Sequence, residues 1–156
     1  MSATDSAFIC HSTFFSVRTR GELDIVDVSE EVFARVERSG VEDGFAHLFV
    51  AGSTAALTTV EFESGALSDL RAAIERIAPE GIHYDHDARW GDGNGRSHVR
   101  AAVLGPSLTV PVRDGGPVLG TWQQVILIEL DLRARDRVIY LTVTGGKQQR
   151  AGKSGS

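Results

Sequence analysis

The sequence has few of the features that would tie the chain to an oxidising compartment, a membrane or a nucleic acid. It has one cysteine, Cys10, so no disulfide can form within the chain. It has no apolar run of about twenty residues, and no charged-then-apolar leader begins it. Its 16 Lys and Arg against 21 Asp and Glu give a net charge of −5, which argues against a nucleic-acid or anionic-membrane surface. We therefore expect a cytoplasmic protein with neither of these partners.

The length and hydrophobic content indicate one domain. A chain of 156 residues with 42% hydrophobic residues suits a single compact core and leaves no room for a second one. The C-terminal stretch "GKQQRAGKSGS" is polar and glycine-rich, without apolar periodicity. We therefore expect a folded domain over residues 1–146 and a flexible tail over residues 147–156.

Apolar periods of two alternate with periods of three to four along the chain, which is typical of mixed strands and helices. Helix signals include Ser29 and Ser97 as N-caps, and Gly40 and Pro79 at helix ends. Strands are expected at residues 7–20, 44–52, 55–63, 107–112, 121–132 and 137–145, and helices at 29–40, 64–79 and 97–105. This order predicts an α+β fold: a single domain with a mainly antiparallel sheet and two or three helices packed on it.

The most polar stretch is "HYDHDARWGDGNGRSHVR", residues 83–100, which holds three of the five histidines and three aspartates. Imidazole and carboxylate groups at short spacing are common ligands of divalent metal ions. If residues 83–87 are extended, His83 and His86 point to opposite faces, so at most one of them joins His98. We predict that His86 does. The alternative is a solvated loop whose histidines bind nothing.

The glycines of "GDGNG" point to a second property of this stretch. Gly91, Gly93 and Gly95 permit positive φ angles, so that successive N–H groups could face an anion. The stretch also contains three arginines, among them Arg96, and a helix N-terminus is expected beside them. These features are compatible with a phosphate site next to a metal. The pattern is neither a P-loop nor a dinucleotide fingerprint, and an ordinary glycine-rich connection is the alternative.

Outside this stretch, several residues are weaker candidates. Ser53 and Ser107 lie beside glycines at expected strand ends, where a hydroxyl can reach a phosphate, although small residues at such positions more often have packing or turn roles. The indole of Trp122 can lie against an aromatic ring of a ligand, or it can pack in the core. His11 and His47 alternate within apolar strands, so we expect structural roles for both.

Three segments resemble the YjbQ-like family, whose members are often described as secondary thiamine-phosphate synthases. They are "GSTAALTTVEFESG", "YDHDARWGDGNGRSHVRAAVLGPSLTVPVRDG" and "LGTWQQVILIELD". The resemblance covers roughly residues 8 to 145, in the family's order and spacing. It implies a compact α+β fold, assembly as a homotrimer, and a pocket of polar residues that binds a metal.

The resemblance also implies roles for single residues. In the metal site, His86 and His98 match family histidines, and either Glu61 or Glu129 supplies a carboxylate ligand, a general base or an orienting group. We assign the metal ligands as His86, His98 and Glu129, and the catalytic residues as Glu61, Asn94 and Gln123. The substrate-binding residues are Ser53, Arg96, Ser107 and Trp122. The chain departs from the family where many relatives carry histidine, at Gly52 and at Arg96. These departures leave fewer nitrogen ligands, so the expected divalent ion, zinc or magnesium, is not identified by the sequence.

The function that the resemblance implies is a metal-assisted transferase, a thiamine-phosphate synthase. It would join a hydroxymethylpyrimidine diphosphate to a thiazole phosphate and release pyrophosphate, so a small phosphorylated metabolite is the expected partner. The chemistry requires a cation, anion-binding groups and an aromatic wall. Two alternatives use the same residues: a metal-dependent phosphohydrolase, and a non-catalytic protein that binds a metal or a phosphorylated metabolite.

Overall fold

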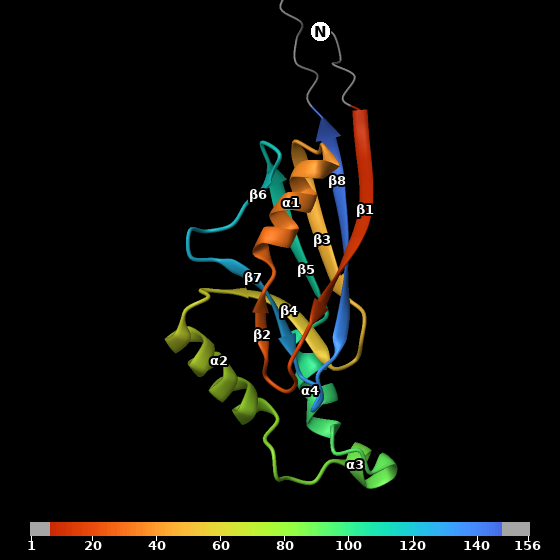
Figure 1. Cartoon of the computed structure of the whole chain (residues 1–156), viewed down its shortest axis with the longest axis vertical. Helices are drawn as coiled ribbons and strands as arrows, with labels where there is room; N and C mark the ends of the chain where they lie inside the picture. The colour runs from red at the N-terminus through yellow and green to blue at the C-terminus, as the bar shows by residue number, and fades with distance from the viewer. Residues whose placement is uncertain (1–6, 148–156) are drawn as a thin grey trace, which may run out of the picture.

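The computed structural model describes residues 7–147, and its strands form two antiparallel sheets (Figure 1). The first sheet has the order β1 (Ala7–Arg18), β8 (Asp136–Lys147), β3 (Asp43–Val50), β5 (Ser107–Arg113), β6 (Gly116–Pro117). The second has the order β2 (Ile25–Asp27), β7 (Gln124–Glu129), β4 (Ala55–Val60). The predicted tail lies outside the described residues except for Lys147, which ends β8 opposite Ala7.

Four helices occur within residues 7–147: α1 (Ser29–Ser39), α2 (Ser64–Ile77), α3 (Asp85–Trp90) and α4 (Gly95–Leu104). With the sheets, they confirm the predicted α+β class. Both predicted serine caps are wrong: Val28 is the N-cap residue of α1 and Asn94 that of α4, so Ser97 lies inside the first turn. Gly40 ends α1 in the left-handed conformation, as predicted. No helix of the described range is long and apolar enough to cross a membrane.

The core has two layers because β7 is buried on both faces. Val125 and Leu127 pack toward the first sheet together with Val32 and Val36 of α1. The alternate residues of β7 and the residue after it, Ile126, Ile128 and Leu130, pack in a second cluster with α2 and α4, through residues such as Ile74 and Ala101. This double burial explains why the sequence of β7 is continuously apolar rather than alternating. The second sheet is thus the middle layer of the molecule.

The face of the first sheet that points away from this core carries exposed aromatic residues. Strand register places Phe14, Tyr140 and Phe49 side by side on adjacent strands, and Phe45 lies four residues before Phe49 on the same face. The side chains of Phe14, Tyr140 and Phe45 are more than half exposed. We call this surface, with Phe8, the outer sheet face. It combines a large apolar area with few charges, which is unusual for a surface exposed to water.

Candidate functional site

The polar stretch of the sequence forms α3, a tight turn and the start of α4. Gly91 ends α3 with φ of 69° and donates its N–H to the carbonyl of Asp87 at 2.8 Å. This left-handed conformation favours glycine, which has no Cβ to clash with the following carbonyl. The turn returns the chain toward α3, so that Asp92 lies beside the side chain of His86. A helix that was not expected from the sequence therefore builds the site.

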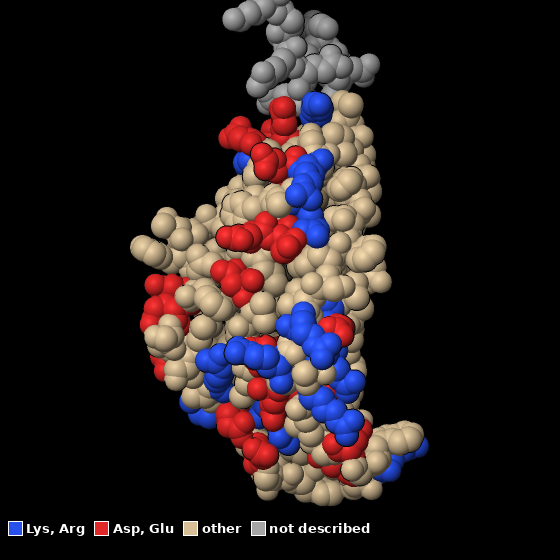
Figure 2. All heavy atoms as spheres, viewed as in Figure 1, with Lys and Arg blue, Asp and Glu red and all other residues tan. Residues whose placement is uncertain are grey.

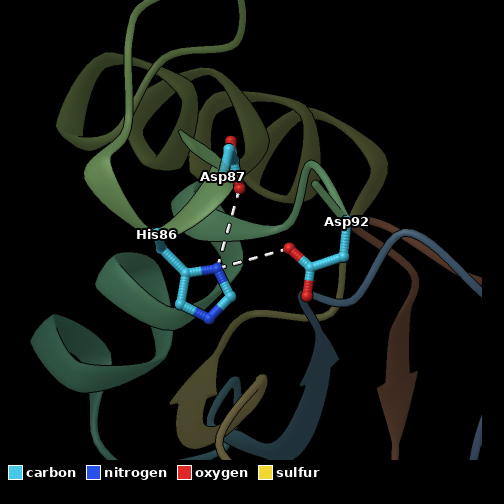
Figure 3. A group of neighbouring side chains, drawn as sticks. All are labelled: His86, Asp87 and Asp92. Carbon is cyan, nitrogen blue, oxygen red and sulfur yellow. Dashed lines mark ion pairs between the residues drawn. The ribbon is translucent and has the colours of Figure 1, made fainter. Parts of the chain in front are cut away.

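His86, Asp87 and Asp92 form a compact cluster (Figure 3), which we call the His86 cluster. Nδ1 of His86 lies 3.3 Å from Oδ1 of Asp92 and 3.7 Å from Oδ1 of Asp87. This nitrogen is buried and makes no hydrogen bond with the described residues, although the rest of the side chain is partly exposed. Figure 3 shows that the second ring nitrogen of His86 lies on the side of the ring away from both carboxylates. A buried imidazole nitrogen that makes no hydrogen bond and faces two carboxylates offers, with them, ligand atoms for a cation.

The structure also brings together the two histidines that the sequence predicted to meet. The imidazole rings of His86 and His98 have centroids 4.5 Å apart, with an angle of 38° between their planes. His83 lies apart from them: its Nε2 is 3.1 Å from Oδ1 of Asp85, and both side chains are highly exposed. His98 is thus a neighbour of the His86 cluster, whereas His83 is not. The metal-binding role of His86 and His98 stays a prediction.

Two groups of the turn orient the carboxylates of the His86 cluster. The N–H of Gly95 donates to Oδ1 of Asp87 at 2.7 Å. A Cβ at position 95 would come within 2.7 Å of the Cβ of Tyr84, so only glycine permits this approach. When the amide nitrogen of Asn94 faces Asp92, it donates to both carboxylate oxygens, at 3.2 and 3.3 Å. Asn94, which we predicted to be catalytic, thus holds a carboxylate in place.

The predicted anion-binding groups have partners inside the protein. Arg96 donates from Nε and Nη2 to the two carboxylate oxygens of Glu22, at 2.6 and 2.9 Å, and from Nη1 to the carbonyl of Gly93 at 3.3 Å. This pairing raises the pKa of Arg96 above its ordinary value. The fully buried Arg100 donates to the same carboxylate at 2.8 Å. The N–H groups of Gly91 and Gly95 are bound to Asp87, so the structure does not present them as a free nest.

Glu129 is not among the residues of the His86 cluster. It is fully buried and accepts hydrogen bonds from Nε and Nη2 of Arg137, at 2.8 and 2.5 Å. It also accepts from the hydroxyl of Thr19 and from the N–H of Asp131, both at 2.8 Å. Both carboxylate oxygens of Glu129 are therefore used inside the protein. In the structure Glu129 forms an ion pair with Arg137 and does not lie with the other predicted metal ligands.

The other predicted site residues are spread over the molecule. Glu61 follows β4, and Trp122 and Gln123 precede β7, all at one end of the second sheet, where Val60 pairs with Gln124. The opposite end, where Ala55 pairs with Glu129, lies about 17 Å away for strands of six residues. That end is closer to the His86 cluster, because Cδ1 of the nearby Leu132 lies 3.8 Å from the position that a Cβ on Gly93 would take.

Their side chains have little contact with that cluster. Gln123 donates to Thr59, and Trp122 is 71% exposed. Ser53 is exposed in the connection from β3 to β4. Ser107 is exposed opposite Phe49, on the outer sheet face. These predicted residues are therefore not gathered into one site by a single chain.

The sequence interpretation missed Asp87 and Asp92. The carboxylate ligand was predicted to come from a distant strand, as Glu61 or Glu129, because the sequence did not predict a conformation for residues 83–94. One signal was available: Asp87 directly follows His86, and Gly91 four residues later is a typical helix end. A short helix with this end would have suggested that Asp92 returns toward His86.

Comparison with known proteins identifies the family. The profile described as "UPF0047 protein YjbQ-like" matches residues 13–146. A UPF0047 protein of Methanothermobacter thermautotrophicus is 39% identical over 129 residues, which are 83% of this chain and 88% of that protein. The crystal structure of a protein of unknown function from Sulfolobus solfataricus, described as YbjQ-like, has a TM-score of 0.84 and 32% identity, with 89% of this chain and 99% of that chain covered. A hypothetical protein of Aeropyrum pernix has a TM-score of 0.79 and 28% identity, with 86% and 98% covered. The chain belongs to the UPF0047, YjbQ-like family.

Proposed function

We propose that this protein is a metal-assisted enzyme that acts on a small phosphorylated metabolite. The observation that carries the proposal is the buried Nδ1 of His86, which makes no hydrogen bond and lies 3.3 Å from a carboxylate oxygen of Asp92 and 3.7 Å from one of Asp87. One ligand atom from each of these residues lies within 4.8 Å of the others. His98 stacks against His86 and adds a second imidazole to the same region. Such a mixture of imidazole and carboxylate groups fits a divalent ion.

The residues of the chain would divide the work as follows. His86, Asp87 and Asp92 would hold the ion, with His98 as an additional ligand or as a wall of the site. Asn94 and the N–H of Gly95 would fix the two carboxylates. A bound divalent ion stabilises negative charge on phosphate oxygens and lowers the pKa of a bound water. The imidazole content favours zinc over magnesium, which prefers an all-oxygen shell.

The specific reaction that the family resemblance implies is the joining of a hydroxymethylpyrimidine diphosphate to a thiazole phosphate. In that reaction a carbon–oxygen bond to the diphosphate breaks, a carbon–nitrogen bond forms, and pyrophosphate leaves. A cation near the diphosphate would favour its departure. The proposal therefore includes thiamine-phosphate synthase activity as the first reaction to test.

The proposal also includes assembly into a homotrimer. The outer sheet face, with Phe14, Phe45, Phe49 and Tyr140, offers an apolar surface of the kind that subunits bury against each other. Glu61, Trp122 and Gln123 lie at the far end of the second sheet, so a neighbouring subunit is the means by which they could join a site that includes the His86 cluster.

Metal binding is the direct test. Purified protein, stripped with a chelator, is dialysed against zinc, and bound metal is measured by elemental analysis. We expect about one zinc per wild-type chain, and at least tenfold weaker binding for His86→Ala and for Asp92→Asn, because each change removes a ligand. His83→Ala is the matched control, because it removes an exposed histidine of the same stretch. Equal loss in the control, or unchanged binding in His86→Ala, would contradict the assigned ligands.

A turnover assay separates an enzyme from a binding protein. Zinc-loaded wild type and His86→Ala are incubated with both thiamine precursors, and thiamine phosphate, phosphate and pyrophosphate are measured. Thiamine phosphate formed by the wild type and lost in the variant supports the proposal. Release of phosphate alone would indicate a phosphohydrolase. Tight metal binding without turnover of these precursors would favour the non-catalytic alternative.

A further inference from the structure

A shallow depression lies beside the turn that carries Asp92. Its volume is about 300 Å³, and it is lined by Arg20, Gly21, Glu22, Leu23, Asp24, Arg71 and Leu132. These residues come from the connection between β1 and β2, from α2 and from the segment after β7. We call it the Arg20–Arg71 depression. It lies outside the His86 cluster and contains none of its residues.

The two carboxylates of the depression are already neutralised by internal partners. Glu22 accepts hydrogen bonds from both Arg96 and Arg100. Asp24, whose side chain is 6% exposed, accepts from Nε and Nη2 of Arg20 and from the backbone N–H of Arg20. Burial alone would raise the pKa of Asp24, but these hydrogen bonds and the nearby charge of Arg71 hold it below its ordinary value. Asp24 therefore stays ionised at neutral pH, and both carboxylates are engaged by guanidinium groups of the protein.

The two arginines of the depression retain donors. Among the hydrogen bonds of residues 7–147, none uses Nη1 of Arg20 or the Nη1 and Nη2 of Arg71. Arg71 is positioned by its Nε, which donates to the carbonyl of Leu23 at 3.0 Å. Arg20 is held by Asp24, although its side chain is 87% exposed. Two oriented guanidinium groups with unused N–H groups match the geometry of a phosphate.

Two side chains of the depression, Leu132 and Glu22, connect it to the turn that carries the His86 cluster. Cδ1 of Leu132, on its wall, lies 3.8 Å from the position that a Cβ on Gly93, the residue after Asp92, would take. Glu22, also on its wall, binds Arg96, which in turn donates to the carbonyl of Gly93. Figure 2 shows that Lys and Arg side chains gather over the lower part of the molecule, with acidic side chains between them. The Arg20–Arg71 depression and the carboxylates of the His86 cluster therefore lie on either side of the Gly93 segment, so one phosphorylated ligand could reach both.

We propose that the Arg20–Arg71 depression binds a phosphate or diphosphate group, with Arg20 and Arg71 as the direct ligands. Its role as the phosphate subsite of the substrate rests on the proposed function; its affinity for the anion does not. The sequence interpretation gave this role to Arg96. The structure assigns Arg96 instead to Glu22, and leaves Arg20 and Arg71 with donors to spare.

The probe is inorganic pyrophosphate, titrated calorimetrically into metal-free wild-type protein at low ionic strength. The informative variant is Arg71→Gln, because Arg71 is only partly buried and its loss leaves the ion pair between Arg20 and Asp24 in place. Arg76→Gln is the matched control: it makes the same charge change at an exposed position of the same helix. We expect binding about tenfold weaker in Arg71→Gln and unchanged in Arg76→Gln. Added salt should weaken binding to the wild type.

The outcomes distinguish this inference from the proposed function. Equal weakening in Arg71→Gln and Arg76→Gln would mean that only net charge matters, and would overturn the subsite. Absence of pyrophosphate binding by the metal-free wild type would also overturn it, whatever the metal does. Failure of the proposed function would appear instead as a loss of zinc binding or turnover, while the pyrophosphate titration of the metal-free protein gave the expected result.

Discussion

The buried ion pair between Glu129 and Arg137 gives a sharp test of what Glu129 does. Glu129 is completely buried and Arg137 is 7% exposed. Glu129→Gln keeps the size of the side chain but removes its charge, so the guanidinium of Arg137 stays buried without a counter-ion. Breaking a buried pair in this way costs about 3–5 kcal/mol. For a domain of this length, that corresponds to a melting temperature lower by roughly 10 °C.

The assay is thermal and urea unfolding, followed by circular dichroism, with zinc content measured on the same samples. Glu61→Gln is the control, because Glu61 is exposed and the same change should alter the free energy of unfolding by less than about 0.5 kcal/mol. The double variant Glu129→Leu with Arg137→Met should lose less than the sum of the two single changes. A stable Glu129→Gln protein that has lost its zinc would refute the structural role and restore the predicted metal ligand.

Three further predictions test the fold and its assembly. The hydrogen bonds from Arg135 hold the pKa of Asp131 below its ordinary value despite burial, so its stabilising effect should be present above about pH 4 and lost below it. Asp131→Asn should therefore be less stable than the wild type at pH 7 in urea unfolding, with the difference vanishing in acid. Gly44→Ala should destabilise by about 2 kcal/mol or more, because its Cβ would lie 1.9 Å from the carbonyl oxygen of Thr144. Gly116→Ala should melt like the wild type, because its Cβ would meet only the carbonyl oxygen of Arg113, at an ordinary contact distance of 3.9 Å. Light scattering should give three times the 16.8 kDa chain mass, and less for Phe45→Glu on the outer sheet face; a wild-type monomer would disprove the trimer.

The strands and the longer helices were predictable because their burial is recorded in their periodicity. The continuous apolar sequence from Val125 to Ile128 predicts a strand buried on both sides, and the structure places it between two layers of the core. The stripe of Leu67 and Ile74 on α2 likewise predicts the face that packs. The periodicity did not predict the second sheet as a separate sheet. One of its strands, β2, has only three residues, which are too few to show an alternating pattern.

The candidate site was harder to predict because its geometry depends on ion pairs between distant segments. The sequence indicated that His86 and His98 would meet, but not that Arg96 would be bound by Glu22, 74 residues earlier. A charged residue in a polar stretch looks available until its partner is known. Glu129 raised the same difficulty: the family resemblance implied that it binds the metal, but its partner Arg137 on another strand could not be foreseen.

Glu22 connects the two candidate sites through a single carboxylate. It lies on the wall of the Arg20–Arg71 depression, and its partner Arg96 reaches the backbone next to Asp92. An anion that shifts Glu22 would therefore shift the loop of the His86 cluster, and an ion in the cluster would shift Glu22. Thermodynamic linkage requires these effects to be equal: the factor by which zinc changes the affinity for pyrophosphate is the factor by which pyrophosphate changes the affinity for zinc. In Glu22→Gln, which weakens this connection, the two ligands should bind independently of each other.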